Sequence, residues 1–161
     1  NFADQPIHQQ AWLIHELTSI SAIKIDNIYK FKKMDKRILL VAAILGVTAI
    51  ILGAFGAHAL KKVLSVEQLT TFEVGVRYQM YHALFLLFVG TFAFLGEKER
   101  SIIFYLTIVG VLFFSGSIYL LATNTITNLK TKFLGPVTPI GGLFLVSAWV
   151  YLFYAVLSKK Q

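Results

Sequence analysis

The stretch GAFGAHALKKVLSVEQLTTFEVGVRYQMYH (residues 53–82) decides the fold, because it closes one long apolar run and opens the next. It contains two of the chain's four histidines, His58 and His82. It also places an acid and a base, Glu73 and Arg77, one helical turn apart. On either side of it the chain consists mainly of apolar runs with short basic connectors. This arrangement predicts a membrane protein whose polar residues gather at one membrane face.

The composition supports that class. The chain has 161 residues, of which 57% are hydrophobic and 14% charged, and its mean hydropathy is +0.70. The apolar residues come in long blocks, as in membrane proteins. The net charge of +7 comes from lysines and arginines that flank these blocks, which favours anionic lipid over nucleic acid as the partner. The absence of cysteine excludes disulfides, zinc–cysteine sites and iron–sulfur ligation.

Four apolar segments predict an all-α, integral membrane four-helix bundle. An apolar helix of about 20 residues crosses the hydrocarbon core of a bilayer. The first segment is long for a secretory signal peptide, and the chain after it continues as a membrane protein. The predicted spans are residues 38–60, 78–95, 101–122 and 138–157.

The connector after the first span carries its own helix signal. Ser65 followed by Gln68 is a capping-box pattern, so a helix should begin near Val66. Leu69, Phe72 and Val76 would share one face of it, which predicts a short interfacial helix between spans 1 and 2.

The basic residues predict that both termini are cytoplasmic. With the N-terminus inside, ten lysines and arginines fall on the cytoplasmic side and five on the other. Without residues 1–33 the margin narrows to six against five. The expected location is the bacterial inner membrane, crossed several times.

Residues 1–33 differ in composition from the rest, and two interpretations are open. They could form an amphipathic helix on the membrane surface, because their apolar residues recur at loosely helical spacing. They could instead be an extension foreign to the working protein, since Met34 opens a short basic segment followed directly by an apolar run. In both cases residues 34–161 form the transmembrane domain.

Polar side chains of all four spans fall near one predicted membrane face. Ionisable groups inside a membrane are costly and therefore mark candidate sites. Each also has a structural interpretation, such as a hydrogen bond to a neighbouring helix. The candidate cluster comprises His58, Glu73, Arg77, Gln79, His82, Ser115, Tyr119 and Thr138.

Small residues recur along the spans at intervals of three and four, and such stripes let helices approach closely. The glycines expected to serve helix packing are Gly46, Gly53, Gly56, Gly110, Gly116, Gly141 and Gly142.

Four ordered blocks carry a family resemblance: GAFGAHAL (53–60), FEVGVRYQMYHAL (72–84), FSGSIYLLA (114–122) and GPVTPIGG (135–142). They resemble the signature blocks of domain-of-unknown-function family 423, whose members are small four-helix bacterial inner-membrane proteins with eukaryotic relatives. The resemblance runs from about residue 34 to the end of the chain. It implies fold and location, and it brings no assigned chemistry.

Three functions from different classes follow as hypotheses. The first is a non-enzymatic accessory or assembly subunit of a larger membrane complex, with lipid and other subunits or further copies as partners and no cofactor. No catalytic constellation is visible in the sequence. The second is a transport or ligand-binding protein that uses the polar cluster at the outer face. The third is haem or metal binding through His58 and His82, expected at similar depth on neighbouring helices.

Overall fold

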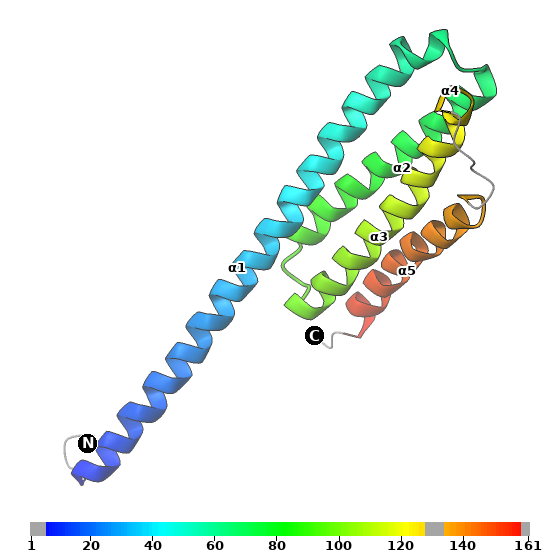
Figure 1. Ribbon diagram of the computed structural model, residues 1–161. Helices are drawn as coiled ribbons and strands as arrows, with labels where there is room; N and C mark the ends of the chain where they lie inside the picture. The colour runs from blue at the N-terminus through cyan, green and yellow to red at the C-terminus, as the bar shows by residue number, and fades with distance from the viewer. Residues whose placement is uncertain (1–5, 128–133, 159–161) are drawn as a thin grey trace.

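A computed structural model describes residues 6–127 and 134–158, and it confirms an all-helical chain (Figure 1). No strand occurs in these two ranges. The elements are α1 (Ile7–His58), the 3₁₀ turn η2 (Leu60–Lys62), α2 (Val66–Thr91), α3 (Glu97–Ala122), the short α4 (Asn124–Thr127) and α5 (Val137–Leu157).

Three of the described segments are long and apolar enough to cross a membrane: Asp35–Lys62, Glu97–Ala122 and Val137–Leu157. Helix α2 is not among them, although it has the same 26-residue length as α3. Its middle carries Arg77, Gln79 and His82, which lower its hydropathy. Three predicted spans therefore coincide with apolar helices, and the fourth stays a prediction.

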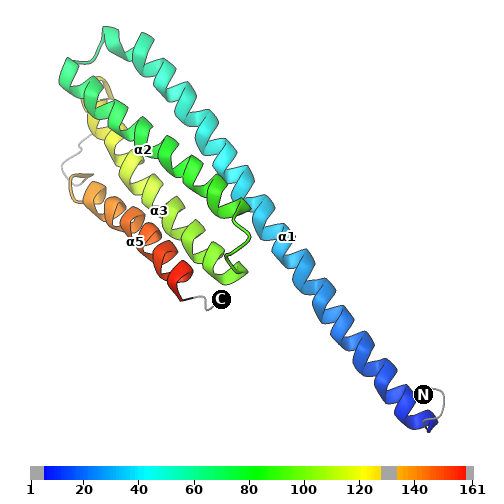
Figure 2. The same cartoon turned by 180° about the vertical axis from the view of Figure 1, so that it is seen from behind.

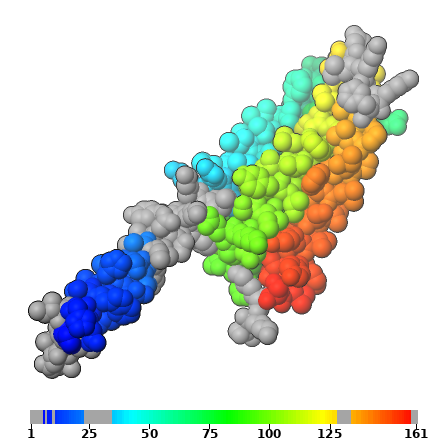
Figure 3. All heavy atoms as spheres, turned by 60° about the horizontal axis from the view of Figure 1, so that its bottom comes forward, coloured from blue at the N-terminus to red at the C-terminus, as the bar shows by residue number. Residues whose placement is uncertain are grey.

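Helix α1 does not break between the predicted extension and the first predicted span. It runs for 52 residues, since no proline or glycine interrupts the chain between Pro6 and Gly46. Its first part leaves the bundle and extends far beyond it (Figures 1 and 2). The space-filling view shows the blue part of this arm lying away from the packed helices (Figure 3).

The capping box is confirmed, but the separate interfacial helix is not found. The backbone N–H of Gln68 donates to Ser65 Oγ at 3.2 Å, and the N–H of Ser65 donates to Gln68 Oε1 at 3.0 Å. The helix that begins there continues without interruption to Thr91, so the expected interfacial helix is the first part of α2. The second predicted span also ends early, because Phe92 already has an extended backbone.

The long helices pack in a row, in the order α1, α2, α3 and α5, so that α1 and α5 form its two edges (Figure 1). Each helix packs against its neighbour in the chain, and α1 makes a small additional contact with α3. The core between α2, α3 and α5 includes Phe85, Val89, Ile103 and Ala148. Smaller apolar clusters join α1 to α2 at both ends of the pair.

Contacts between neighbouring helices define common levels along the row. At one level, a Cβ on Gly53 of α1 would lie 3.4 Å from Val76 of α2. At the same end, Thr138 in the first turn of α5 lies 2.6 Å from Ser117 of α3. At the opposite end, Asp35 of α1 pairs with Arg100 of α3. Helix α5 has 21 residues and is therefore about 31 Å long, close to the thickness of a hydrocarbon core.

Candidate functional site

Gln79 is the centre of the polar cluster and joins three helices. Its Nε2 donates to the carbonyl oxygen of Leu45 at 2.9 Å and to Thr48 Oγ1 at 2.7 Å, both on α1. Its Oε1 accepts from the hydroxyl of Tyr119 on α3 at 2.9 Å. The side chain is 5% exposed, so these bonds form away from solvent. Both N–H groups and the oxygen of the amide are thus used in bonds between helices.

Glycine makes room for this network. Gly75 lies one turn before Gln79, and a Cβ there would lie 2.7 Å from Cε1 of Tyr119. The Tyr119 ring also packs on Phe72, with the ring centroids 4.9 Å apart. The small residue therefore lets the aromatic ring lie flat against α2, which brings its hydroxyl to the amide.

Thr138 does not join this network and instead links α3 to α5. Its Oγ1 lies 2.6 Å from Ser117 Oγ. Ser117 Oγ donates to the carbonyl of Phe114 at 3.0 Å, so the Thr138 hydroxyl is left as donor to Ser117. Thr48 and Ser117 were absent from the expected cluster, because a single hydroxyl in an apolar run gives no periodic signal that distinguishes it.

His82 and Ser115 are buried, and each has one atom without a hydrogen-bond partner in the described chain. His82 is 5% exposed, and its Nδ1 lies 2.8 Å from the carbonyl oxygen of Tyr78. A carbonyl can only accept, so Nδ1 carries the proton. The partnerless atoms are Nε2 of His82 and Oγ of Ser115.

The remaining three members of the expected cluster, His58, Glu73 and Arg77, are exposed and lie apart from Gln79's bonds. Within residues 6–127 and 134–158, no ion pair joins Glu73 to Arg77. The helical spacing permits that pair, but each side chain is free to adopt another rotamer at an exposed position.

The two histidines lie at different levels, in contrast to the similar depth expected from the sequence. His58 ends α1, five residues beyond the level of Gly53. His82 adjoins Ala83, which faces Gly46 of α1. Twelve helical residues between Gly46 and His58 correspond to about 18 Å, so one metal or haem iron cannot be bound by both side chains. No group of three potential metal-binding His, Asp or Glu side chains occurs in the part of the chain described.

Most of the glycines named for helix packing face atoms of a neighbouring helix. The closest case is Gly141, where a Cβ would meet the backbone of Phe113 and Phe114. Gly110 faces Leu145, and Gly53, Gly56, Gly46 and Gly142 all face side chains within 4 Å. Gly116 is a correction, since no atom of another residue lies within 4 Å of a Cβ placed there. Gly75 and Gly90, which share one side of α2 in the sequence pattern, also pack against neighbouring helices.

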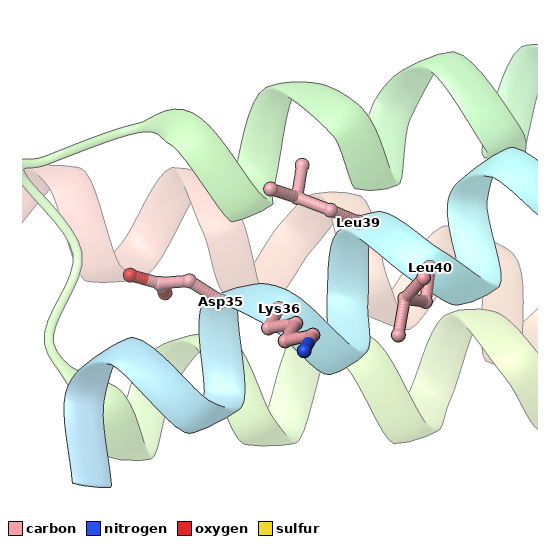
Figure 4. Close-up of a pocket in the computed structure, with 4 residues that line it drawn as sticks. All are labelled: Asp35, Lys36, Leu39 and Leu40. Carbon is pink, nitrogen blue, oxygen red and sulfur yellow. The ribbon is translucent and has the colours of Figure 1, made fainter. Parts of the chain in front are cut away.

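A buried ion pair at the opposite end of the row was also missed. Arg100 is 2% exposed, pairs with Asp35 through Nη1, and donates from Nη2 to the carbonyl of Phe92 at 2.8 Å. It therefore connects the middle of α1, at Asp35, with the turn between α2 and α3. Figure 4 shows Asp35 and Lys36 leaving α1 in different directions. Both line a pocket of about 460 Å³ together with Leu39 and Leu40. In the sequence, Asp35 and Arg100 looked like ordinary charged residues that flank the apolar spans.

The chain is similar to a described protein family and to several bacterial membrane proteins. The model of a family described as Protein of unknown function (DUF423) matches residues 52–142. UPF0382 membrane protein SH2409 of Staphylococcus haemolyticus is 37% identical over 73% of this chain and 92% of its own. UPF0382 membrane protein YwdK of Bacillus subtilis is 36% identical over 74% and 95%. UPF0382 inner membrane protein YgdD of Escherichia coli is 32% identical over 80% and 95%. No solved structure matches the chain.

Proposed function

The chain belongs to the DUF423 family of membrane proteins, and from this premise we propose that it is a four-span inner-membrane protein that binds other membrane subunits rather than catalysing a reaction. The observation that carries the proposal is the set of bonds around Gln79. The side chains of Gln79, Thr48 and Tyr119, which transport or catalysis could otherwise use, are occupied in holding α1, α2 and α3 together. Interhelical hydrogen bonds of this kind stabilise membrane bundles.

Helix α2 can serve as the fourth span because its polar residues bond within the protein or lie near the proposed membrane boundary. The level of Gly53 and Val76 coincides with the start of α5, which supports a membrane boundary near that level. Arg77 is exposed next to this boundary, and a long arginine side chain can reach the headgroups from there. Gln79 is satisfied within the protein.

An even number of spans supports both termini on one side. Helix α1 enters the row at the end where α5 leaves it (Figure 1). The surplus of lysine and arginine at that end favours the cytoplasm.

The edges of the row offer surfaces for other subunits. Leu40, Ile44, Val47 and Ile51 are all more than half exposed on α1 and recur at intervals of four, three and four residues. This spacing forms a continuous apolar ridge of the kind that a second helix packs against. The ridge lies on the edge helix and is not covered by α5.

The test is the composition of the native particle extracted in mild detergent. We expect a particle larger than the chain itself, with a fixed set of other membrane proteins. Val47→Trp on the ridge should release them, whereas Leu84→Trp should not. Val47 and Leu84 are 57% and 56% exposed, so the control places the same tryptophan side chain at a similarly exposed site on α2. A particle of this chain alone, together with unchanged levels of every membrane complex after deletion of the gene, would overturn the proposal.

The polar-ligand and haem alternatives have weaker support. Glu73 and Arg77 do not converge with Gln79 and His82 on one cavity, and the two histidines are too far apart for one iron. An absorption spectrum of the purified protein with a haem band that His82→Phe removes would reverse this ranking.

A further inference from the structure

A groove of about 540 Å³ runs between α2 and α5, with α3 beneath it. Its walls include Tyr78 and His82 of α2, Phe114 of α3, and Gly142, Val146 and Trp149 of α5. The packing order explains the groove, because α2 and α5 each pack mainly on α3 and meet one another through side chains such as Phe85 and Trp149. Under the proposed topology this groove lies within the membrane and opens sideways.

His82 gives this apolar groove its one unusual chemical feature. Its Nδ1–H is used by the Tyr78 carbonyl, so in the neutral ring Nε2 presents a lone pair. That atom accepts no hydrogen bond within residues 6–127 and 134–158, and the side chain is buried, with only 5% exposed. A buried acceptor without a partner costs free energy, and hydrocarbon chains cannot supply a donor. The groove therefore matches an apolar molecule that carries a hydroxyl.

The walls favour a ring next to that hydroxyl. In the walls, Tyr78 packs on Phe114 with centroids 4.8 Å apart, and Trp149 is backed by the buried Phe85 at 4.2 Å. His82 lies between these pairs, 6.4 Å from Tyr78 and 6.1 Å from Phe85 by ring centroids. Aromatic side chains pack favourably on the faces and edges of further rings. A hydrophobic tail could then follow Val146 along α5.

We propose that this groove binds a membrane-dissolved phenol or hydroquinone, whose hydroxyl donates to Nε2 of His82. Electrostatic complementarity between the unpaired acceptor and a hydroxyl donor distinguishes this occupant from an acyl chain. The site is independent of the apolar ridge on α1. Its failure would leave the subunit proposal standing, since the two are measured separately.

Tryptophan fluorescence can test the proposal directly. The chain has two tryptophans, and a Trp12→Phe background leaves Trp149 in the groove wall as the sole reporter. The probe is decylhydroquinone, added to the full chain in lipid nanodiscs. The matched probe is its dimethyl ether, which has the same ring and tail but no hydroxyl donor. We expect saturable quenching, with the hydroquinone binding about tenfold more tightly than the ether.

Two variants separate the hydrogen bond from the groove. His82→Phe keeps a ring and should make the two probes bind equally, while Val146→Phe should fill the groove and weaken both. Val146 is 59% exposed, so its enlargement leaves the protein core intact. His58→Phe, at the exposed end of α1, is the control and should change nothing.

Equal binding of hydroquinone and ether to the wild-type protein would overturn the proposal and identify an apolar lipid groove only. Quenching without saturation would overturn it as well. If His82→Phe does not fold, unchanged affinity of Val146→Phe for both probes would also refute the site.

Discussion

At the scale of single residues, Gln79 shows how a polar side chain can be buried between apolar helices. A primary amide offers two N–H donors and an oxygen acceptor, and Leu45, Thr48 and Tyr119 use all of these groups. The same amide facing lipid would leave these groups unpaired. Its position at the junction of three helices is therefore the reason it can be buried.

Replacing Gln79 should destabilise the protein more than replacing any one of its partners. We expect Gln79→Leu to lower the free energy of unfolding by about 1–3 kcal/mol, because three interhelical bonds are lost and the Tyr119 hydroxyl is left unpaired. Tyr119→Phe removes one bond and should cost about 1 kcal/mol. Unfolding in detergent measures both, with the exposed Glu73→Gln as a control expected near zero. A Gln79→Leu variant as stable as the wild type would contradict the structural role.

Two glycines form a matched pair for a second prediction. Gly75→Ala would place a methyl group 2.7 Å from the Tyr119 ring and 3.1 Å from Ile118, so we expect a loss of about 1–3 kcal/mol. Gly116→Ala meets nothing within 4 Å and gains helix propensity, so its stability should be unchanged or higher by up to about 1 kcal/mol. Thermal unfolding midpoints of the two variants would decide, and the reverse order would refute the packing described.

At the scale of elements, the ion pair between Asp35 and Arg100 holds α1 to the rest of the row. Arg100 also binds the Phe92 carbonyl just after α2, so one side chain connects α1, the α2–α3 turn and α3. This is the point at which α1 leaves the bundle as a free arm (Figure 2). The pair therefore sets where the packed part of α1 begins.

Breaking this ion pair should lower the free energy of unfolding, whichever of its two side chains is replaced. Arg100 is buried and Asp35 is 24% exposed, so removing one partner leaves a partly buried charge uncompensated, which costs about 1–3 kcal/mol. We expect Asp35→Asn and Arg100→Gln each to destabilise by roughly this amount, and the double variant by clearly less than their sum. Lys98→Gln, exposed on the same helix, is the control. Strict additivity in this double-mutant cycle would show that the two side chains are not coupled.

At the scale of the whole molecule, a row of helices differs from a closed bundle in its surfaces. Helices α1 and α5 are edges, and each exposes an apolar flank along its length. The groove between α2 and α5 and the ridge on α1 both result from this open packing. Membrane location, supported by the named relatives, explains why such apolar surfaces are stable, because they face lipid.

The proposed topology can be tested on this chain with little background, because it has no cysteine. Lys62→Cys and Lys98→Cys introduce single thiols at exposed positions on opposite ends of the row. With both termini cytoplasmic, a membrane-impermeant maleimide should label position 62 in intact spheroplasts, and position 98 only after permeabilisation. Labelling of position 98 alone, without permeabilisation, would show the opposite topology. Labelling of both positions without permeabilisation would show that α2 does not span the membrane.

The sequence alone determined the helical class, the family and most helix boundaries, because these depend on local properties. Apolar length predicted the second half of α1 and nearly all of α3 and α5, and the Ser65–Gln68 pattern located the start of α2. Gln79, Tyr119 and the packing of Gly141 were also foreseeable, since polar or small residues in apolar runs need a neighbouring helix.

Only the tertiary structure decided which of these residues meet. The sequence predicted that His58 and His82 lie at a similar depth on neighbouring helices, but the register in which α1 packs on α2 places them at different levels. Flanking charge looked equivalent at Asp35, Lys36, Lys98 and Arg100, yet burial selected Asp35 and Arg100 as partners. Gly116 looked like a packing residue but faces open space. These outcomes depend on helix rotation and register, which arise from the sum of many side-chain contacts between helices and leave no local pattern in the chain.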